Sequence, residues 1–167
     1  MRNRTPSELE EKFPKLHAGN YSKTSEATAR YNCLAFANDH DRKWWQAGLF
    51  GGRYYWPPNI IDTLDGWVKI FTDQGYVLTK NRGVEPGFEK VAIYVDQKDV
   101  DQMHVAKSDG RSWKSKLGRY QDIEHDSLSL LEGDVEWEYG IVERVLKRPI
   151  SLAKLARKKR SIKGSRR

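Results

Sequence analysis

Two short runs of alternating residues flank the dipeptide Asp109-Gly110, and this pair constrains the fold more than any other feature of the sequence. Asp-Gly between two strands favours a two-residue type I′ turn, which fixes the register of a β-hairpin. Residues 103–108 and 111–117 are therefore predicted to pair with Ser108 opposite Arg111. One face of this hairpin carries few lysines, and we expect it to be the buried face: His104, Ala106, Trp113, Ser115 and Leu117.

Helical and strand patterns surround the hairpin. Ser7 and Glu10 form a capping-box pattern near the N-terminus, and Asn32 is a suitable N-cap for an apolar helix. The resulting prediction is an α+β domain built from helices over residues 29–38 and 59–75 and from strands over residues 76–79, 89–95, 103–108, 111–117 and 139–147.

The chain divides by charge into three parts. Residues 151–167 contain eight Lys or Arg and no Asp or Glu, which leaves 22 basic against 23 acidic residues in the rest of the chain. We predict an N-terminal arm over residues 1–20, one compact domain over residues 21–150 and a flexible basic tail over residues 151–167. The tail is either a solubilising segment or a weak, nonspecific contact for nucleic-acid phosphates. Its candidate contacts are Arg157, Lys158, Lys159 and Arg160.

The sequence also bears on compartment and cofactors. Its single cysteine excludes an intrachain disulfide, and its N-terminus lacks the apolar segment of a secretory signal. No stretch approaches the roughly 20 apolar residues that span a bilayer. We therefore expect a cytoplasmic protein with no membrane partner. No Gly-rich phosphate loop and no Cys/His metal set occurs, so no cofactor or metal is expected.

The lone cysteine, Cys33, falls in the first turn of a predicted helix, where unpaired backbone N–H groups and the helix dipole favour a thiolate. His104 on the inward face of the hairpin is a candidate base for that thiol, and Ser115 on the neighbouring strand could orient its imidazole. Asp122 is a rival orienting residue, as are Glu124 and His125. The alternative is that Cys33 is a small buried apolar residue and His104 a structural histidine.

An aromatic loop over residues 44–58 follows the predicted cysteine helix. It either lines a substrate groove or covers an open edge of the sheet. The hairpin lysine Lys116 either binds an anionic substrate or is a solvated strand residue. The candidate substrate contacts are Trp44, Trp45, Trp56, Trp113 and Lys116.

Several motifs, in order, resemble an uncharacterised bacterial domain family over residues 21–148: Tyr31-Asn32-Cys33-Leu34-Ala35-Phe36-Ala37, Glu89-Lys90-Val91-Ala92-Ile93-Tyr94, His104-Val105-Ala106 and Ser115-Lys116-Leu117-Gly118. That family is in turn similar to papain-like folds such as the CHAP and NlpC amidase-peptidases. In those, the nucleophilic cysteine opens a helix packed on an antiparallel sheet, and a histidine followed by small apolar residues lies on a strand. The strand after it usually carries His, Asn, Asp or Glu, where this chain has Ser115.

The resemblance implies a cysteine hydrolase or acyltransferase that attacks an amide bond of a protein or peptide-like substrate. Its Cys33–His104 dyad would form an acyl-enzyme, and the backbone N–H of Cys33 would contribute to an oxyanion hole. Two alternatives stay open. One is a catalytically silent papain-like scaffold for protein interaction, and the other is a small nucleic-acid-associated protein that uses its basic tail.

Overall fold

A computed structural model describes residues 5–164, apart from the side chains of residues 158 and 161–164. Its main element is a seven-stranded sheet in the order β1-β8-β7-β6-β5-β9-β4, in which every pair of neighbours is antiparallel. The strands are β1 (Tyr21–Lys23), β4 (Val77–Thr79), β5 (Phe88–Val95), β6 (Met103–Ser108), β7 (Trp113–Lys116), β8 (Asp122–His125) and β9 (Ile141–Pro149). The helices are α1 (Glu8–Lys12), α2 (Cys33–Ala37), α3 (Leu64–Thr72), the 3₁₀ helix η1 (Leu128–Leu131) and α4 (Leu152–Gly164). The short strands β2 (Trp44–Trp45) and β3 (Tyr54–Tyr55) form a separate parallel pair.

The predicted α+β class with an antiparallel sheet is therefore confirmed. All five strands expected from the alternating patterns are present: β6 has its predicted bounds, and the other four have shifted ends. The chain's final strand, β9, does not lie at an edge. It pairs with β5 on one side and β4 on the other, so it runs through the interior of the sheet.

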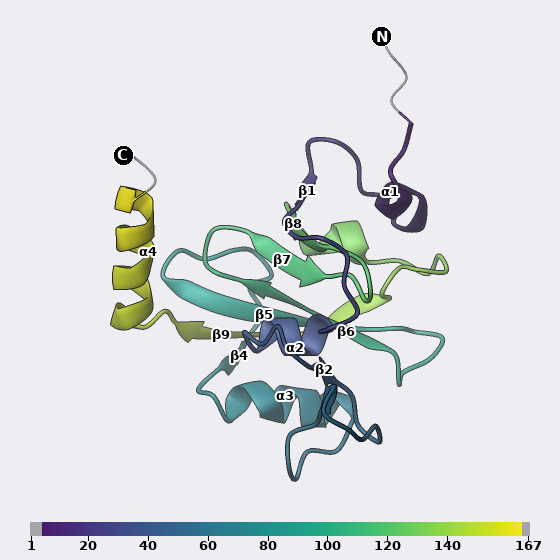
Figure 1. Cartoon of the computed structure of the whole chain (residues 1–167), viewed down its shortest axis with the longest axis horizontal. Coiled ribbons are helices and arrows are strands. Elements are labelled where there is room, and N and C mark those ends of the chain that lie inside the picture. Colours follow the sequence, from purple (N-terminus) through teal and green to yellow (C-terminus); the bar gives the residue numbers. More distant parts are fainter. Residues whose placement is uncertain (1–4, 165–167) are drawn as a thin grey trace.

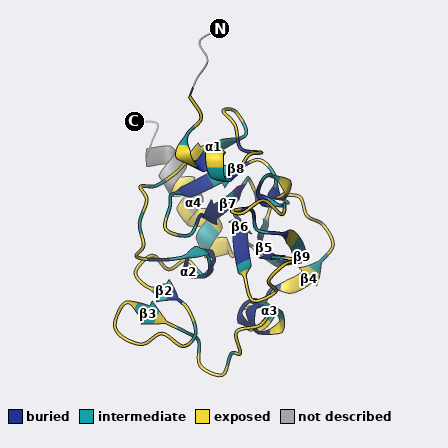
Figure 2. Ribbon diagram, turned by 90° about the vertical axis from the view of Figure 1, so that its right-hand side faces the viewer, coloured by how far each residue is buried: buried dark blue, intermediate teal, exposed yellow. Residues whose placement is uncertain are grey.

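Both faces of the sheet are covered, which Figure 1 shows as α1 on one side and α2 and α3 on the other. The first core lies under α2 and α3 and includes Leu34, Phe71, Val91, Ile93 and Val105. The second core lies under α1 and η1 and contains Leu9, Ala92, Tyr94, Ala106, Trp113, Leu117 and Ile123. Consecutive strand residues thus alternate between two buried faces, which explains the dark central strands of Figure 2.

The register of the central hairpin differs from the sequence prediction. Ser108 pairs with Trp113, and not with Arg111, so the loop holds four residues. The Asp109 carboxylate accepts hydrogen bonds from the backbone N–H groups of Arg111 and Ser112. This Asx-type turn competes with the two-residue turn that Asp-Gly favours. Because the shift is two residues, every side chain keeps its predicted face.

The N-terminal arm is part of the domain, unlike the separate segment that the sequence predicts. The capping box is present, since the Ser7 hydroxyl accepts from the Glu10 N–H and the Glu10 carboxylate accepts from the Ser7 N–H. Leu9, Phe13 and Leu16 beyond it are at most 2% exposed and belong to the second core. The sequence predicted only a short helix here, but the apolar side chains of the segment pack into the core of the domain.

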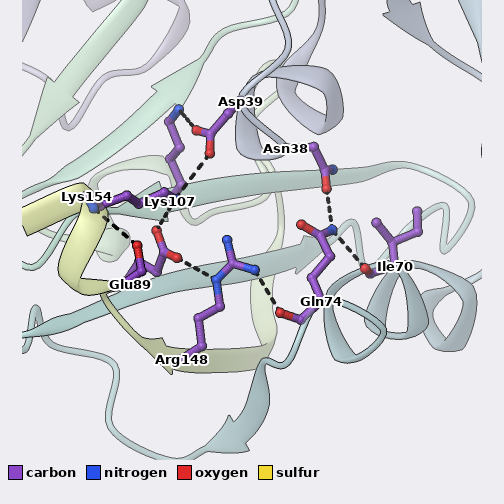
Figure 3. Close-up of polar contacts among 9 residues, drawn as sticks. Asn38, Asp39, Ile70, Gln74, Glu89, Lys107, Arg148 and Lys154 are labelled. Atoms are coloured by element: carbon purple, nitrogen blue, oxygen red, sulfur yellow. Dashed lines mark hydrogen bonds and ion pairs between the residues drawn. The ribbon is translucent and has the colours of Figure 1, made fainter. Parts of the chain in front are cut away.

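The basic segment also differs from the flexible tail expected, because Leu152–Gly164 forms the helix α4. Lys154 anchors its start: the ammonium donates to Glu89 Oε2 at 2.8 Å and lies 3.6 Å from Asp39 Oδ2 (Figure 3). Arg148 and Lys107 complete the surrounding ion pairs with Glu89 and Asp39. α4 therefore continues the fold from β9 while its described side chains beyond Lys154 stay largely exposed.

Candidate functional site

Asn32 positions the start of α2 and the aromatic loop together. Its side-chain oxygen accepts from the Ala35 N–H at 3.2 Å, which caps the helix as predicted, and from the Trp45 N–H at 3.1 Å. Its side-chain nitrogen donates to the Trp45 carbonyl at 2.8 Å. One residue thus ties β2 to the turn that carries Cys33. Trp45 is 8% exposed and packs on the domain, whereas Phe50 at the far end of the loop is 92% exposed.

Cys33 is half-buried, and its thiol lies in a largely apolar, packed environment. Burial raises the pKa of the thiol to about 11, and the weaker opposing influences are hydrogen bonds from the Val105 and Leu34 backbones and the charge of Lys116. This differs from the lowered pKa that we expected from a helix N-terminus. The helix has only five residues, so its dipole is too small to outweigh burial. At pH 7 the thiol is therefore protonated.

His104 begins a buried chain of hydrogen bonds that crosses three strands. His104 Nε2 lies 3.1 Å from Ser115 Oγ, and Ser115 Oγ lies 2.9 Å from His125 Nε2. His125 Nδ1 lies 2.9 Å from the carbonyl oxygen of Ser127. Each of the three side chains is at most 1% exposed. The side-chain contact that an orienting role of Ser115 requires is present, while the role itself stays a prediction.

The polarity of this chain follows from its last acceptor. A carbonyl oxygen only accepts, so His125 Nδ1 must carry a proton. Burial lowers the pKa of His125 to about 4, so at neutral pH its Nε2 is unprotonated and accepts from the Ser115 hydroxyl. Ser115 Oγ then accepts from His104, whose Nε2 must carry a proton. Because burial, followed by the neighbouring His125, lowers the pKa of His104 well below its usual range, the lone pair of His104 resides on Nδ1.

Aromatic rings hold the His104 imidazole in place. The Tyr139 ring stacks on it with centroids 3.8 Å apart and an interplanar angle of 3°. The Tyr94 ring meets it edge-on at 5.3 Å, and the Tyr94 hydroxyl donates to the Leu128 carbonyl. His104 therefore has one fixed ring plane as well as one fixed tautomer.

Cys33 and His104 belong to opposite faces of the sheet. Cys33 packs against the first core, whereas His104 lies opposite Tyr94 of the second core. They converge at one end of β6, where the thiol is hydrogen-bonded by the backbone of Val105, the residue after His104. Both line one cavity of about 280 Å³, together with Asn32, Trp44, Trp45, Gln46, Trp56, Asp62, Trp67, Asp101, Gln102, Met103, Gly118 and Tyr139. Among the described residues, no hydrogen bond joins the thiol to the imidazole.

The predicted substrate contacts separate into two groups. Trp44, Trp45 and Trp56 line the cavity, as the substrate-groove interpretation requires. Trp113 is instead a core residue, 1% exposed, and does not line it. Lys116 is buried as well, so the prediction of a solvated strand lysine is wrong. Its ammonium donates to the carbonyls of Thr28, Gly118 and Tyr120, which uses all three of its protons and leaves none for a ligand.

The orienting residue differs from the carboxylate considered from the sequence. Asp122 is bound by the Tyr31 hydroxyl at 2.7 Å and lies on the strand opposite Lys116, away from the imidazole chain. Ser115 meets His125 in its place. The sequence predicted His125 only as an alternative orienting residue, because the strand β8 was not predicted. Tyr139 was predicted only as the first residue of a strand, and nothing in the local sequence indicated that its ring stacks on His104.

The remaining predicted contacts lie on α4. Arg157, Lys159 and Arg160 are exposed, while the side chain of Lys158 lies outside the described residues. Within residues 5–164, no helix combines the length and apolar character needed to cross a bilayer. In the same part of the chain, no group of three or more His, Cys, Asp or Glu residues is arranged to bind a metal ion.

Comparison with known proteins identifies the family. The family model described as a domain of unknown function (DUF7689) matches residues 22–147, so the chain belongs to this family. No curated protein and no solved structure shows significant similarity to the chain.

Proposed function

We propose that this DUF7689 domain is a papain-like cysteine hydrolase or acyltransferase, in which Cys33 attacks an amide carbonyl and His104 is the general base. One observation carries the proposal: the only cysteine of the chain and an imidazole of fixed tautomer line the same cavity. The order of a cysteine-bearing helix followed by a histidine-bearing antiparallel strand also agrees with the papain-like resemblance. The substrate is a protein or peptide-like molecule.

The reaction proceeds in two steps, acylation of Cys33 and deacylation. His104 Nδ1 removes the thiol proton as Cys33 Sγ bonds to the carbonyl carbon, and the backbone N–H of Cys33 stabilises the oxyanion. The imidazolium then returns that proton to the leaving amine as the C–N bond breaks, which leaves a thioester. Water or a second amine attacks the thioester while His104 removes its proton, and that proton passes to Cys33 Sγ as the C–S bond breaks. Ser115 accepts from His104 Nε2 throughout, which leaves Nδ1 as the basic nitrogen for the reaction.

The resting state is a neutral pair. The raised pKa of the thiol and the lowered pKa of the imidazole both oppose a preformed thiolate–imidazolium pair. Proton transfer must therefore accompany attack on the substrate. The rate at which Cys33 reacts with a general thiol reagent does not measure its catalytic activity. The appropriate probe is an acyl donor.

Acylation by p-nitrophenyl acetate tests the proposal. We expect a burst of p-nitrophenolate and a mass increase of one acetyl group on Cys33, absent in Cys33→Ala. The variant His104→Gln should acylate at least about 100-fold more slowly, because general-base catalysis contributes roughly 10²–10⁴-fold. The exposed His17 gives the matched control, His17→Gln, which should acylate at the wild-type rate. Equal burst rates in His104→Gln and wild type would refute a role for His104.

A second candidate is a binding domain without chemistry, and the raised pKa of the thiol favours it. In that case the aromatic cavity holds a ligand and Cys33 is a packing residue. Acetylation that is absent from Cys33 in the experiment above, while the folded domain still binds peptides, would favour this candidate.

The basic helix α4 supports a third candidate, nonspecific association with nucleic acid. Arg157, Lys159 and Arg160 are exposed and can contact phosphates. Replacing the three with Ala while keeping Lys154 preserves the anchor of α4. Such a variant should bind duplex DNA more weakly. The slope of log K against log salt concentration should become shallower by about 3, because three phosphate contacts are lost. An unchanged salt dependence would exclude α4 as the contact.

A further inference from the structure

A larger cavity of about 740 Å³ adjoins the thiol cavity and has a different chemical character. The two share five lining residues, Trp44, Gln102, Met103, Gly118 and Tyr139, so the larger cavity lies directly beside the one that contains Cys33. Its volume is that of a small-ligand site. A substrate cleaved at Cys33 would extend into it.

The charges along this second cavity are mainly negative. Asp96, Glu136 and Glu138 line it, against one cation, Arg119. Glu138 is the most informative of these, because its side chain is 3% exposed and its Oε2 accepts no hydrogen bond within the described part of the chain. The carboxylate is ion-paired with Lys15, whose ammonium lies 3.6 Å from Oε2, and its Oε1 accepts from the Val135 N–H at 3.3 Å, so of its two oxygens Oε2 alone has no hydrogen bond from the described residues. A buried carboxylate oxygen with spare capacity to accept is costly unless a donor joins it.

The aromatic walls of the cavity suit a cation as well. Tyr120 and Trp137 line it with their rings 6.4 Å apart and nearly perpendicular. The domain already places an ammonium against both, since Lys12 Nζ lies 5.1 Å from the Tyr120 centroid and 4.4 Å from that of Trp137. Lys12 thus occupies part of these ring surfaces, and Trp137, which is 45% exposed, keeps ring surface that a second cation can contact.

From these observations we propose that the cavity lined by Trp44, Tyr120, Trp137 and Glu138 binds a peptide segment that carries a cationic side chain. This assigns a substrate class to the site and, for the chemical step only, rests on the proposed function. The ammonium or guanidinium of the segment lies between the aromatic walls and the carboxylates of Glu136 and Glu138. The scissile amide then extends toward Cys33 past Trp44 and Tyr139, which line both cavities.

Binding to Cys33→Ala tests the proposal without any chemistry. The probes are acetylated and amidated tripeptides with a central Lys, norleucine or Glu, titrated while tryptophan fluorescence is recorded. Norleucine matches the lysine side chain without its charge. We expect the Lys peptide to bind at least about fivefold more tightly than the norleucine peptide and the Glu peptide most weakly, with the preference reduced at high salt. Equal affinities, or no binding of the Lys peptide, would overturn the proposal.

Matched charge variants locate the effect. Glu136→Gln combined with Glu138→Gln should remove most of the preference for Lys over norleucine. Asp134→Asn removes one charge from the same loop outside the cavity lining and should leave the preference intact. A preference that survives the double variant, with the thermal midpoint showing that it is folded, would place the cation elsewhere. If the Lys peptide binds as expected but active protein never acylates Cys33, this inference stands and the proposed function fails.

Discussion

Acid should destabilise this domain, and the buried His125 allows the size of the effect to be worked out. The pKa of His125 is lowered to about 4 by burial, against about 6.5 in an unfolded chain. The unfolded state therefore binds the proton first as pH falls, and stability is lost between pH 6.5 and 4. Linkage gives a loss of about 2 kcal/mol between pH 7.5 and 5 from this residue alone. The lowered pKa of His104 adds to the loss in the same direction.

The substitution His125→Gln isolates this contribution. The glutamine side chain cannot titrate, so we expect the loss of unfolding free energy between pH 7.5 and 5 to shrink by about 2 kcal/mol, whatever the substitution costs at pH 7.5. Urea unfolding at several pH values measures the difference. The exposed His17, replaced in His17→Gln, is the control and should leave the pH dependence unchanged. A His125→Gln variant with the pH dependence of the wild type would refute the neutral, buried His125 on which the tautomer assignment rests.

Three further outcomes are expected. Ser115→Val removes the hydroxyl between two buried Nε2 atoms and should cost about 1–3 kcal/mol in urea unfolding, whereas Ser115→Thr, which keeps the hydroxyl, should cost less. Lys116→Met leaves three carbonyls without their donor and should cost at least about 2 kcal/mol, seen as a lower urea midpoint; a neutral result would contradict the ammonium's role in holding the loop. At pH 7, iodoacetamide should alkylate Cys33 more slowly than free cysteine, with a rate that rises toward pH 11 in mass-spectrometric time courses. Labelling faster than free cysteine would show that burial does not control the thiol.

Local patterns predicted the faces of the strands better than their partners. His104 and Ser115 were assigned to one face from alternation alone, and the two-residue error in the hairpin left that assignment intact because side chains alternate with a period of two. The error itself arose because Asp109 binds backbone N–H groups through its carboxylate, a choice that the dipeptide does not reveal. The Asn32 cap, by contrast, was predictable because the cap lies within three residues of its donor.

Elements that depend on distant partners were missed. The strand β1 comes from the polar stretch Tyr21–Lys23 and exists through its pairing with β8, which was also missed. His125 therefore had no predicted neighbour. The helix α4 was predicted to be a flexible tail from its charge alone. Its contact with the domain could not be predicted, because Lys154 binds Glu89, which lies 65 residues earlier in the chain. The sequence predicted that Cys33 and His104 share a site, but it did not reveal that they approach it from opposite faces of the sheet.

The row of donors and acceptors from Ser127 to His104 has one direction, and Ser115 has a single proton to give. If His125 gains a proton on Nε2, it donates to the serine oxygen, and the serine proton then finds an acceptor in this row only by rotating toward His104. The imidazole of His104 then has to carry its hydrogen on Nδ1, the nitrogen that otherwise receives the thiol proton. Acid at one end of the row would in this way silence the other end while leaving His104 itself uncharged.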